Sequence, residues 1–580
     1  MKAAELASYR LDHLGMVATM ADEIGLVDII DSLAGVDKNE IVTTGQATLA
    51  MVVNCLGFVS RPLYITPQFF QSKLVHFLIG KCKTAKKIEL KPEHLNESKL
   101  GRTLDKIYEM GPDTLFQTIA FAAARKQGLK INSLHGDTTT HSFYGDYVGN
   151  NADGMKNSWG GDEPCEIQIA HAFSKDHRAD CKQIVQELLV SSDGDVPLML
   201  KVHSGNASDV IVFRERIAEL KKQFIAASAE DLMPEYIVFD CKFYAQENLK
   251  LCKAENQKWI TRVPDNITEV RECIANAVAD KKWTTIGKNE DLDENESESK
   301  NWYRYRSYRV TKNEVRQQFI VVKSKTGMVR AQKTIERRIE TEREKLLSGI
   351  KKISEKPFAC EPDARVAAQE ILKKCVYFKI KETKITSIKS YLSKRRPKAN
   401  ENPVTQYFVD VEISEPTPKE VATLVEEEAC FVIGTNEQEE SKAAEIISLY
   451  RKEQQGVERA FRFLKNPMYF AEASFLKNRK RVVALVTIMT IALLIYSLLQ
   501  RKIRILLEQK GETLPNQKKK PTKRPTMNWV NLNFEGVDVI RIGEKGCYEY
   551  KYLRMNDFVQ KTLMVLGPDY QKRYSAEFFT

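Results

Sequence analysis

The sequence lacks the features of a disulfide-bonded, zinc-binding or nucleotide-driven protein. Its eleven cysteines are an odd number and none stands in a C-x-x-C pair, which argues against both a disulfide framework and a zinc ribbon. We therefore expect a reducing, cytoplasmic setting. The residues after Lys2 contain no apolar run of the kind that a secretory signal needs. Neither a GxxxxGK phosphate loop nor a dinucleotide-binding glycine pattern occurs, so ATP-driven and redox chemistry are not expected.

Length and charge indicate a large, basic chain with several domains. At roughly 100 to 200 residues per domain, the 580 residues predict about three or four domains. Lysine and arginine outnumber aspartate and glutamate by 89 to 78, which gives a net charge of +11. This excess favours a polyanionic partner, either nucleic acid or an anionic membrane surface, and charge alone does not separate the two.

One apolar segment, residues 482–500 (VVALVTIMTIALLIYSLLQ), is long enough to approach a membrane span. Thr487, Thr490 and Ser497 interrupt it, and basic residues flank both of its ends, so the positive-inside rule gives no orientation. We expect a buried core helix here rather than a membrane span.

Apolar periodicity divides the chain into five segments. Residues 1–125 predict an all-helical N-terminal domain, which is either a helical bundle that only packs or a domain for DNA-end binding or dimerisation. Residues 126–264 predict the first part of a catalytic α/β core. A β-rich insertion domain is expected over 265–440. Residues 441–505 would complete the core with a long helix, and 506–580 would form a basic linker and a small C-terminal unit.

Within the core, strand and helix patterns alternate. Residues 131–145, 166–176 and 186–205 are predicted as strands, the last with a hairpin turn at SDGD. A helix over 208–224, a strand over 235–240, a helix over 245–257 and a strand over 258–264 follow. Three strands, helix, strand, helix, strand is an α/β layer pattern.

Three carboxylates are candidates for a catalytic metal site. Two-metal phosphodiester cleavage needs clustered hard oxygen ligands. Asp137 precedes a TTT run within a predicted strand, and Asp240 ends the apolar strand YIVF, where open α/β sheets commonly build sites. Taken singly, an aspartate that ends a strand is more often a turn or cap residue than a catalytic one.

Glu458 lies on a predicted helix that ends near Asn466. Arg451, Arg462 and Lys465 fall on the same helix face as Glu458. One interpretation is an ordinary surface pair between Glu458 and Arg462. The other is that Glu458 completes a metal site while the cations bind DNA phosphates.

Four sequence blocks resemble bacterial insertion-sequence transposases. They are HGDTTTHSFYG from His135, FSKDHRADCKQIVQELLVSSDG from Phe173, FDCKFYAQENL from Phe239 and YRKEQQGVERAFRFLKNPMYF from Tyr450. The chain is similar to the insertion-sequence-four superfamily, in the branch typified by element sixteen-thirty-four. The resemblance covers nearly the whole chain, and the blocks follow the expected order.

The resemblance implies an RNase H-like core, a mixed sheet flanked by helices. It implies Mg²⁺ or Mn²⁺ as cofactor, with two ions expected, held by the triad Asp137, Asp240 and Glu458. Lys465 stands at the family's lysine spacing and is expected to contact DNA. Tyr450 is one residue farther from the glutamate than in the family pattern and Gln454 occupies the arginine position, so that Arg451 becomes the candidate substitute.

The implied activity is DNA strand cleavage at insertion-sequence ends followed by strand transfer into target DNA. The DNA-binding residues would be Tyr450, Arg451, Arg462 and Lys465, helped by the basic segments 393–398 and 517–524. A homodimer on double-stranded DNA is expected from the family. The alternatives are a catalytically inactive, transposase-derived DNA-binding protein and a membrane-associated protein built around residues 482–500.

Overall fold

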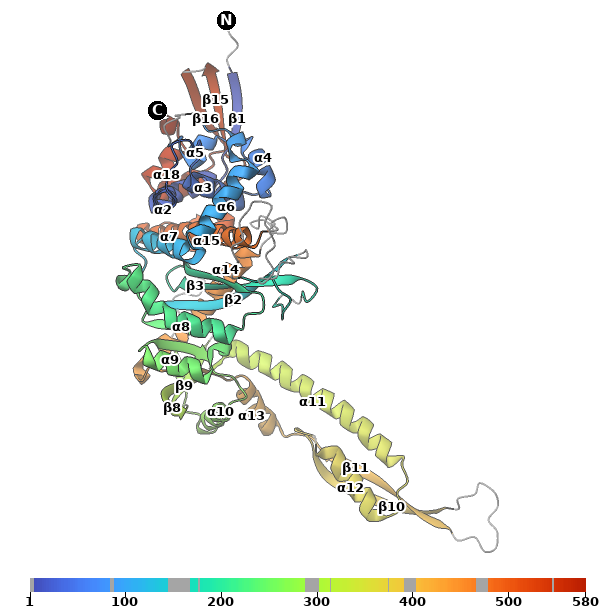
Figure 1. Cartoon of the computed structure of the whole chain (residues 1–580). Coiled ribbons are helices and arrows are strands. Elements are labelled where there is room, and N and C mark those ends of the chain that lie inside the picture. Colours follow the sequence, from blue (N-terminus) through green and yellow to red (C-terminus); the bar gives the residue numbers. More distant parts are fainter. Residues whose placement is uncertain are drawn as a thin grey trace, which may run out of the picture. The chain divides into compact units, whose positions relative to one another are not determined.

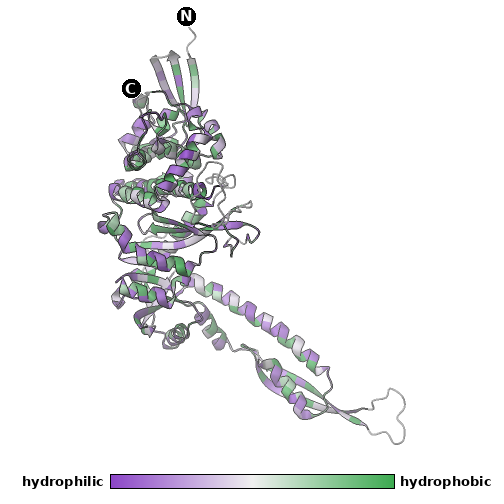
Figure 2. Cartoon of the chain, viewed as in Figure 1, coloured by the Kyte–Doolittle hydropathy of each residue, from purple (hydrophilic) through white to green (hydrophobic). Residues whose placement is uncertain are grey.

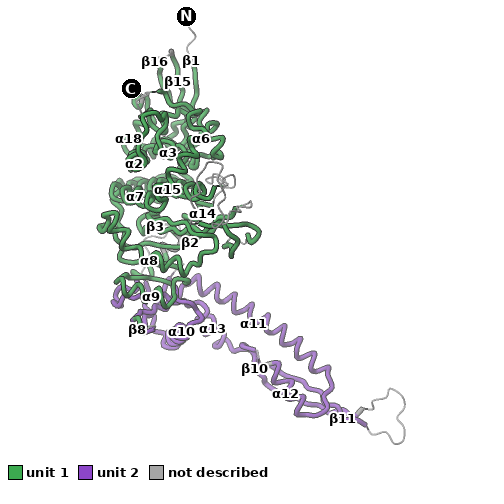
Figure 3. Tube along the Cα trace, viewed as in Figure 1, with its two compact units in different colours: residues 1–261, 313–315, 445–580 green, residues 262–312, 316–444 purple. Residues whose placement is uncertain are grey.

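The computed structural model describes residues 5–83, 88–143, 167–175, 178–286, 302–312, 314–373, 375–390, 403–465, 478–544 and 547–579. These residues belong to two compact units (Figure 3). Unit 1 comprises Met1–Thr261, Asn313–Val315 and Glu445–Thr580, and unit 2 comprises Arg262–Lys312 and Arg316–Ala444. The predicted insertion, residues 265–440, lies inside unit 2 except for residues 313–315.

A mixed sheet forms the centre of unit 1 (Figure 1). Strands β2, β3 and β4 pair antiparallel, while β5 and then β6 pair in parallel on the other side of β2, which gives the order β4-β3-β2-β5-β6. The structure has the predicted order of three strands, helix, strand, helix and strand, although its second strand is not formed by the predicted residues. The elements are β2 (Ser133–Phe143), β3 (Lys182–Ser191), β4 (Pro197–Ser204), α8 (Asp209–Ala226), η3 (Glu230–Leu232), β5 (Tyr236–Phe239), η4 (Cys241–Phe243), α9 (Gln246–Ala254) and β6 (Lys258–Arg262).

Helices cover both faces of this sheet. Neighbouring side chains of a strand point to opposite faces. On β3, Gln186 donates a hydrogen bond to Thr490 of α15 (Arg479–Lys510) at 3.0 Å, whereas Glu187 accepts hydrogen bonds from Arg216 of α8 at 2.7 and 3.0 Å. Helices α15 and α8 therefore lie on opposite faces. Coverage on both sides explains why β3 is buried over almost its whole length.

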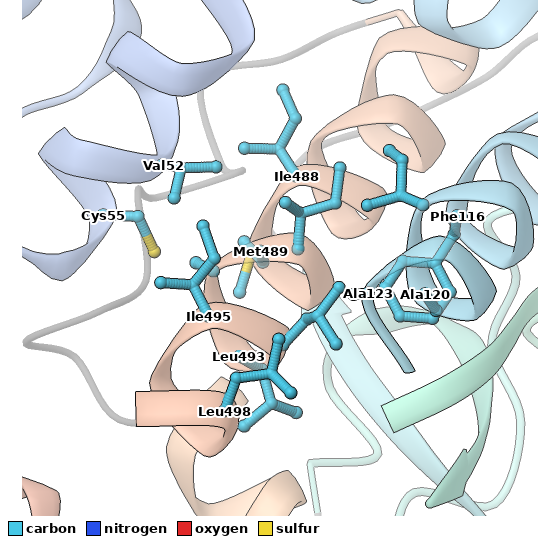
Figure 4. Close-up of a cluster of buried hydrophobic side chains, with 14 of the residues drawn as sticks. Val52, Cys55, Phe116, Ala120, Ala123, Ile488, Met489, Leu493, Ile495 and Leu498 are labelled. Atoms are coloured by element: carbon cyan, nitrogen blue, oxygen red, sulfur yellow. The ribbon is translucent and has the colours of Figure 1, made fainter. Parts of the chain in front are cut away.

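Helix α15 contains the long apolar segment and is the centre of a helical layer. Within the described chain it is the one helix long and apolar enough to cross a membrane, and 94% of its most apolar window is buried inside the protein. It packs against α1, α3, α6, α7 and β4. Figure 4 shows Ile488 and Met489 of α15 near Val52 of α3 and near Phe116 and Ala120 of α7. The prediction of a buried core helix is confirmed by this packing.

The N-terminal segment is mostly helical, but its first element is a strand. Its elements are β1 (Glu5–Arg10), α1 (Leu14–Ile24), α2 (Leu26–Ala34), α3 (Thr44–Leu56), η1 (Leu63–Ile65), α4 (Thr66–Phe70), α5 (Val75–Ile79), η2 (Pro92–Leu95), α6 (Glu97–Glu109) and α7 (Pro112–Lys126). The prediction of an all-helical N-terminal domain is therefore wrong at β1. This strand pairs antiparallel with β15 from the far end of the chain, a partner that local periodicity does not reveal.

The C-terminal segment folds onto the N-terminal helices. After α15 it comprises β13 (Leu514–Pro515), β14 (Pro521–Thr522), α16 (Met527–Asn533), β15 (Asp538–Glu544), β16 (Cys547–Leu553), α17 (Asp557–Leu566), α18 (Pro568–Arg573) and η7 (Ala576–Phe579). Asp12 accepts a hydrogen bond from the Gly536 backbone N–H at 2.7 Å, and the Tyr574 hydroxyl donates to the Asp12 carbonyl at 2.7 Å. The predicted small C-terminal unit thus shares one hydrophobic core with the N-terminal helices.

One predicted strand is not formed. In residues 167–175 the backbone is irregular, and Ala170 alone forms a β-bridge, with Gln183 of β3. The third predicted segment instead supplies two strands, β3 and β4, because the turn at Gly194 and Asp195 has both residues at positive φ and reverses the chain. The total of three antiparallel strands is preserved.

Unit 2 contains both strands and helices, so the prediction of a β-rich insertion is corrected. Its elements are α10 (Thr268–Asp280), β7 (Thr284–Ile286), β8 (Tyr303–Lys312), β9 (Val315–Ser324), α11 (Lys325–Ser354), α12 (Glu361–Leu372), β10 (Lys379–Ser390), β11 (Val404–Ser414), α13 (Pro418–Glu428), β12 (Phe431–Thr435) and η5 (Glu440–Lys442). Helix α11 has 30 residues, mostly hydrophilic in Figure 2. It buries Ile335 and Ile339, at helical spacing, in a hydrophobic cluster that includes residues of α12, β11 and α13. The basic segment 393–398 lies outside the described residues.

Candidate active site

Two of the predicted carboxylates, the aspartate pair Asp137 and Asp240, lie on neighbouring strands. Strands β2 and β5 run parallel, with His135 opposite Val238. Two residues farther along each strand, this register brings Asp137 opposite Asp240, which follows the last residue of β5. Because parallel strands end at the same edge of a sheet, the aspartate pair is built by the fold itself.

Gly136 allows β2 and β5 to approach at this point. A Cβ atom on Gly136 would collide with the ring of Phe239. That ring also packs on Phe213 of α8, with 4.5 Å between the ring centroids. The residues immediately before each aspartate are therefore locked together. We expect this packing to hold the two carboxylates at a fixed separation.

The environment of the aspartate pair favours a cation. Burial is the largest cause that raises the pKa of Asp137; the Lys175 ammonium lowers this pKa, the charge of Asp240 raises it, and the net pKa is about 6. Burial also raises the pKa of Asp240, against a hydrogen bond from the Lys242 backbone N–H at 3.0 Å. Two close, partly desolvated carboxylates repel each other, and a cation between them relieves that repulsion.

A third aspartate, Asp209, adjoins the pair and was missed by sequence reasoning. It is the first residue of α8 and accepts a hydrogen bond from the Thr138 hydroxyl at 2.5 Å. Although burial opposes its ionisation, hydrogen bonds from Lys242 and Thr138 lower the pKa of Asp209. In the sequence, its position at a helix start beside Ser208 reads only as part of a helix cap.

Two lysines, Lys175 and Lys242, complete the centre, and we call them the lysine pair. The Lys175 Nζ atom lies 3.6 Å from Asp137 Oδ1 and 3.4 Å from Asp209 Oδ2. The Lys242 Nζ atom lies 2.5 Å from Asp209 Oδ2. Sequence reasoning singled out neither lysine, although both occur in the blocks that carry the family resemblance.

A buried ionic network between α8 and the sheet supports this centre. Glu187 of β3, 1% exposed, bonds both to Arg216 of α8 and to His203 of β4 at 3.2 Å. The Arg216 guanidinium and the His203 ring lower the pKa of Glu187 to about 2, against the opposing effect of burial. This network ties α8 to the sheet and thereby fixes Asp209 at the start of α8.

The third predicted carboxylate, Glu458, lies on α14 (Ala443–Leu464), so the predicted helix is confirmed. Gly456 and Arg459 face the β3–β4 turn, where Arg459 pairs with Asp195 at 2.7 Å. Glu458 itself is exposed. Among the described residues, no group of three or more His, Cys, Asp or Glu side chains could hold a metal ion. The structure therefore brings Asp137 and Asp240 together without placing Glu458 in a metal-binding group with them.

The predicted DNA-binding residues of α14 differ in exposure. Tyr450 is buried, Arg451 and Lys465 are half-buried, and Arg462 is exposed. Arg462 also lines a 240 Å³ pocket between α14 and α15, together with Arg459 and Tyr496. The contact of these four residues with DNA stays a prediction.

The donor set of the aspartate pair fits a hard divalent cation. Carboxylate oxygens are the ligands that Mg²⁺ and Mn²⁺ prefer. The Lys175 ammonium beside Asp137 shows that this position already attracts positive charge. Two carboxylates on a rigid sheet edge, with lysines and a basic helix in the same unit, suit chemistry on a phosphodiester.

Two family models match the chain. One is described as a transposase DDE domain and matches residues 166–495, and the other, a domain of unknown function, matches residues 6–121. No curated protein matches the chain. A solved synaptic complex of piggyBac transposase with hairpin DNA is similar at 10% identity and a TM-score of 0.32, over 91% of this chain and 82% of that chain. Because the transposase model covers more than half of the 580 residues, the chain belongs to the DDE transposase family.

Proposed function

We propose that this transposase cuts DNA at the ends of an insertion sequence and transfers the cut strands to target DNA, with Asp137, Asp240 and Glu458 as its catalytic carboxylates. The observation that carries the proposal is the position of Asp137 and Asp240 on the paired parallel strands β2 and β5. The matched domain includes Asp240 and Glu458, whereas Asp137 precedes it and is assigned from its register with Asp240.

The finer classification is part of the same proposal. The strand order β4-β3-β2-β5-β6, with β5 and β6 parallel to β2, supports an RNase H-like core. The four sequence blocks support the insertion-sequence-four superfamily and the branch typified by element sixteen-thirty-four. We also propose a homodimer on double-stranded DNA in the cytoplasm, because two element ends must be joined in one reaction.

The aspartate pair would hold Mg²⁺ or Mn²⁺. Bound divalent ions activate a hydroxyl nucleophile and stabilise charge on the phosphate. The protein's own contribution is to fix the two carboxylates on the sheet and to supply positive charge for the DNA backbone from α14.

We propose Glu458 as the third carboxylate because its helix, α14, packs on the helix that covers the sheet face bearing Asp137. The Phe463 ring of α14 packs on Tyr496 of α15, with 4.8 Å between ring centroids. Helix α15 covers the sheet face that carries Gln186. Asp137 lies on that same face. It pairs with Leu188 of β3, and Leu188 points to the same face as Gln186 because the two residues are two positions apart on the strand. Helix α14 thus packs on the helix that covers the face of the sheet bearing Asp137.

In the proposed reaction, water attacks the phosphorus at the element end. The bond from phosphorus to the 3′ oxygen breaks, and the leaving 3′ oxygen takes up a proton. The freed 3′-hydroxyl then attacks a phosphodiester of the target DNA and displaces the 3′ oxygen there. Protein and DNA form no covalent intermediate in this sequence.

The competing candidate is a transposase-derived protein that binds DNA without cutting it. The exposed position of Glu458 favours this second candidate, since a triad is not assembled among the described residues. Both candidates bind element ends, so the separating property is cleavage.

The experiment is cleavage of labelled DNA that carries the element's own ends, with Mg²⁺ and with EDTA. Wild type is compared with Asp137→Asn and Asp240→Asn, and with Asp410→Asn, which removes an exposed carboxylate on β11, as control. We expect metal-dependent nicking that both active-site variants lose and the control keeps. Binding of the wild type to the element ends without cleavage in Mg²⁺ would establish the inactive DNA-binding protein instead.

A further inference from the structure

The lysine pair has a geometry that the proposed triad does not explain. Lys175 comes from the segment before β3 and Lys242 from η4, yet both ammonium groups converge on Asp209 Oδ2, at 3.4 and 2.5 Å. Lys175 also donates hydrogen bonds to the Thr138 hydroxyl at 2.6 Å and to the Thr138 carbonyl at 2.7 Å. Three chain segments are therefore joined next to Asp137 by charge-assisted contacts.

Asp209 is an anchor rather than a further metal ligand. Its Oδ1 atom accepts from Thr138 and its Oδ2 atom accepts from Lys242, so both oxygens are already engaged within the protein. The side chain is 9% exposed, and the buried pair between Arg216 and Glu187 holds its helix on the sheet. Asp209 is thus a positioning residue for the two ammonium groups.

The Lys175 ammonium occupies a place beside Asp137 that a metal ion also requires. It lies 3.6 Å from Asp137 Oδ1, and a divalent cation on the same oxygen would be repelled by a positive charge at this distance. A lysine stem is long and flexible, so the ammonium can leave without rearrangement of the strands. The side chains of Lys175 and Lys242 are 26% and 47% exposed, which leaves both within reach of a bound polyanion.

We propose that Lys175 is the resident counter-ion of Asp137 in the metal-free protein and moves to a DNA phosphate when the divalent ion binds, while Asp209 keeps both lysines near the site. This inference rests on the proposed function, since it assumes a metal at Asp137 and DNA at the same edge of the sheet. The lysine pair would then couple metal entry to phosphate binding.

The first measurement is calorimetric titration of Mn²⁺ into the DNA-free full chain. Lys175→Gln removes the charge but keeps polar atoms near Thr138, and it should bind Mn²⁺ about five- to tenfold more tightly than wild type because a like charge is gone. Lys175→Arg keeps the charge and should bind as wild type does. Lys201→Ala is the matched control, because Lys201 lies in the same sheet, is 25% exposed and pairs with Glu219 instead.

The second measurement is the salt dependence of binding to element-end DNA in Mn²⁺. A plot of log affinity against log salt has a negative slope, and Lys175→Gln should make it less steep by about one, because one phosphate contact is lost. Asp209→Asn should weaken DNA binding in the wild-type background but not in a Lys175→Gln, Lys242→Gln background, because Asp209 acts through these lysines.

Unchanged or weaker Mn²⁺ binding in Lys175→Gln, in a protein whose wild type binds Mn²⁺, overturns the counter-ion role. An unchanged salt slope overturns the transfer to phosphate. Failure of the proposed function looks different, because wild type would then bind no Mn²⁺ and cut no DNA. If Lys175→Gln melts at a lower temperature than wild type, Lys175→Met provides the same loss of charge in a second variant.

Discussion

The aspartate pair and helix α14 contribute to one proposed site, yet they differ in how the fold prepares them. Asp137 and Asp240 sit on paired strands, with Phe239 packed between them and α8. Glu458 is exposed on a helix whose opposite side packs on α15 and on the β3–β4 turn. The first region is fixed by the core, whereas the second presents its acid to solvent.

This difference indicates separate roles for the aspartate pair and for Glu458. Carboxylates with raised pKa values and a nearby ammonium are prepared for a cation before any DNA arrives. A glutamate on an exposed helix face beside the exposed Arg462 is better placed to respond to DNA. We therefore expect the aspartate pair to bind metal in free protein and Glu458 to join the site in the DNA complex.

The sharpest test of this division is Glu458→Gln. Its cleavage of end DNA should fall by at least about a thousandfold, because the proposed third ligand is lost when the reaction needs it. Its Mn²⁺ affinity without DNA should stay within about twofold of wild type, as Glu458 belongs to no metal-binding group among the described residues.

Cleavage and calorimetric titration of the same preparations measure both quantities. Glu344→Gln, which removes an exposed acid from α11, serves as control. A large loss of DNA-free Mn²⁺ affinity in Glu458→Gln would mean that the triad is already assembled and that the two regions do not differ. Cleavage at the wild-type rate would remove Glu458 from the reaction.

Removal of Arg216 tests whether the buried pair with Glu187 keeps the region around the aspartate pair rigid. Arg216→Ala leaves the buried carboxylate of Glu187 with His203 but without its guanidinium partner, and we expect the free energy of unfolding to fall by about 3 to 5 kcal/mol. The neighbouring Arg214→Ala is the control, since Arg214 is 42% exposed, pairs with Glu247 at 3.4 Å, and should cost less than about 1 kcal/mol.

Urea unfolding followed by circular dichroism compares the two variants. Equal losses for Arg214→Ala and Arg216→Ala would show that the buried network does not fix α8, and the assignment of Asp209 as an anchor would lose its support.

Metal binding by the aspartate pair should depend on pH. The pKa of Asp137 is raised to about 6, so the fraction of protonated carboxyl grows as the pH falls through that value. Protons and metal compete for the same oxygens, and the apparent Mn²⁺ affinity of DNA-free protein should fall by about tenfold per pH unit below pH 6. Calorimetry at a series of pH values measures this dependence. An affinity that stays constant down to about pH 5 would show that Asp137 ionises as an ordinary surface carboxyl.

The sequence predicted much of the fold and part of the site. Periodicity located β2, β5, α8, α9, α14 and the buried α15, because each has a regular pattern over its own length. It missed β1, whose partner β15 lies at the other end of the chain. It assigned a strand to residues 166–176, of which the described residues 167–175 form a single bridge. Local patterns do not reveal the pairing of strands that are far apart in the sequence.

The site shows the same limit. Asp137 and Asp240 were identified because each stands in or after an apolar strand within a block of family resemblance. Asp209 and Lys175 carry no local pattern, and their importance comes from convergence on Thr138 in three dimensions. The spacing on α14 predicted a shared face for Glu458 and Arg462, and both are indeed exposed, but spacing could not tell how far this face lies from the aspartates.

The smallest expected effects concern the basic residues of α14. Lys465→Ala and Arg462→Ala should each weaken binding to end DNA by a few-fold and reduce the salt slope by about one, because each removes a single phosphate contact. Neither change should alter Mn²⁺ affinity in DNA-free protein. Lys345→Ala on α11 is an exposed lysine outside unit 1 and serves as the control in fluorescence anisotropy titrations at several salt concentrations. If Lys465→Ala and Lys345→Ala both have the salt slope of wild type, Lys465 makes no phosphate contact. The contrast between a helix that responds to DNA and a preorganised aspartate pair would then rest on Glu458 alone.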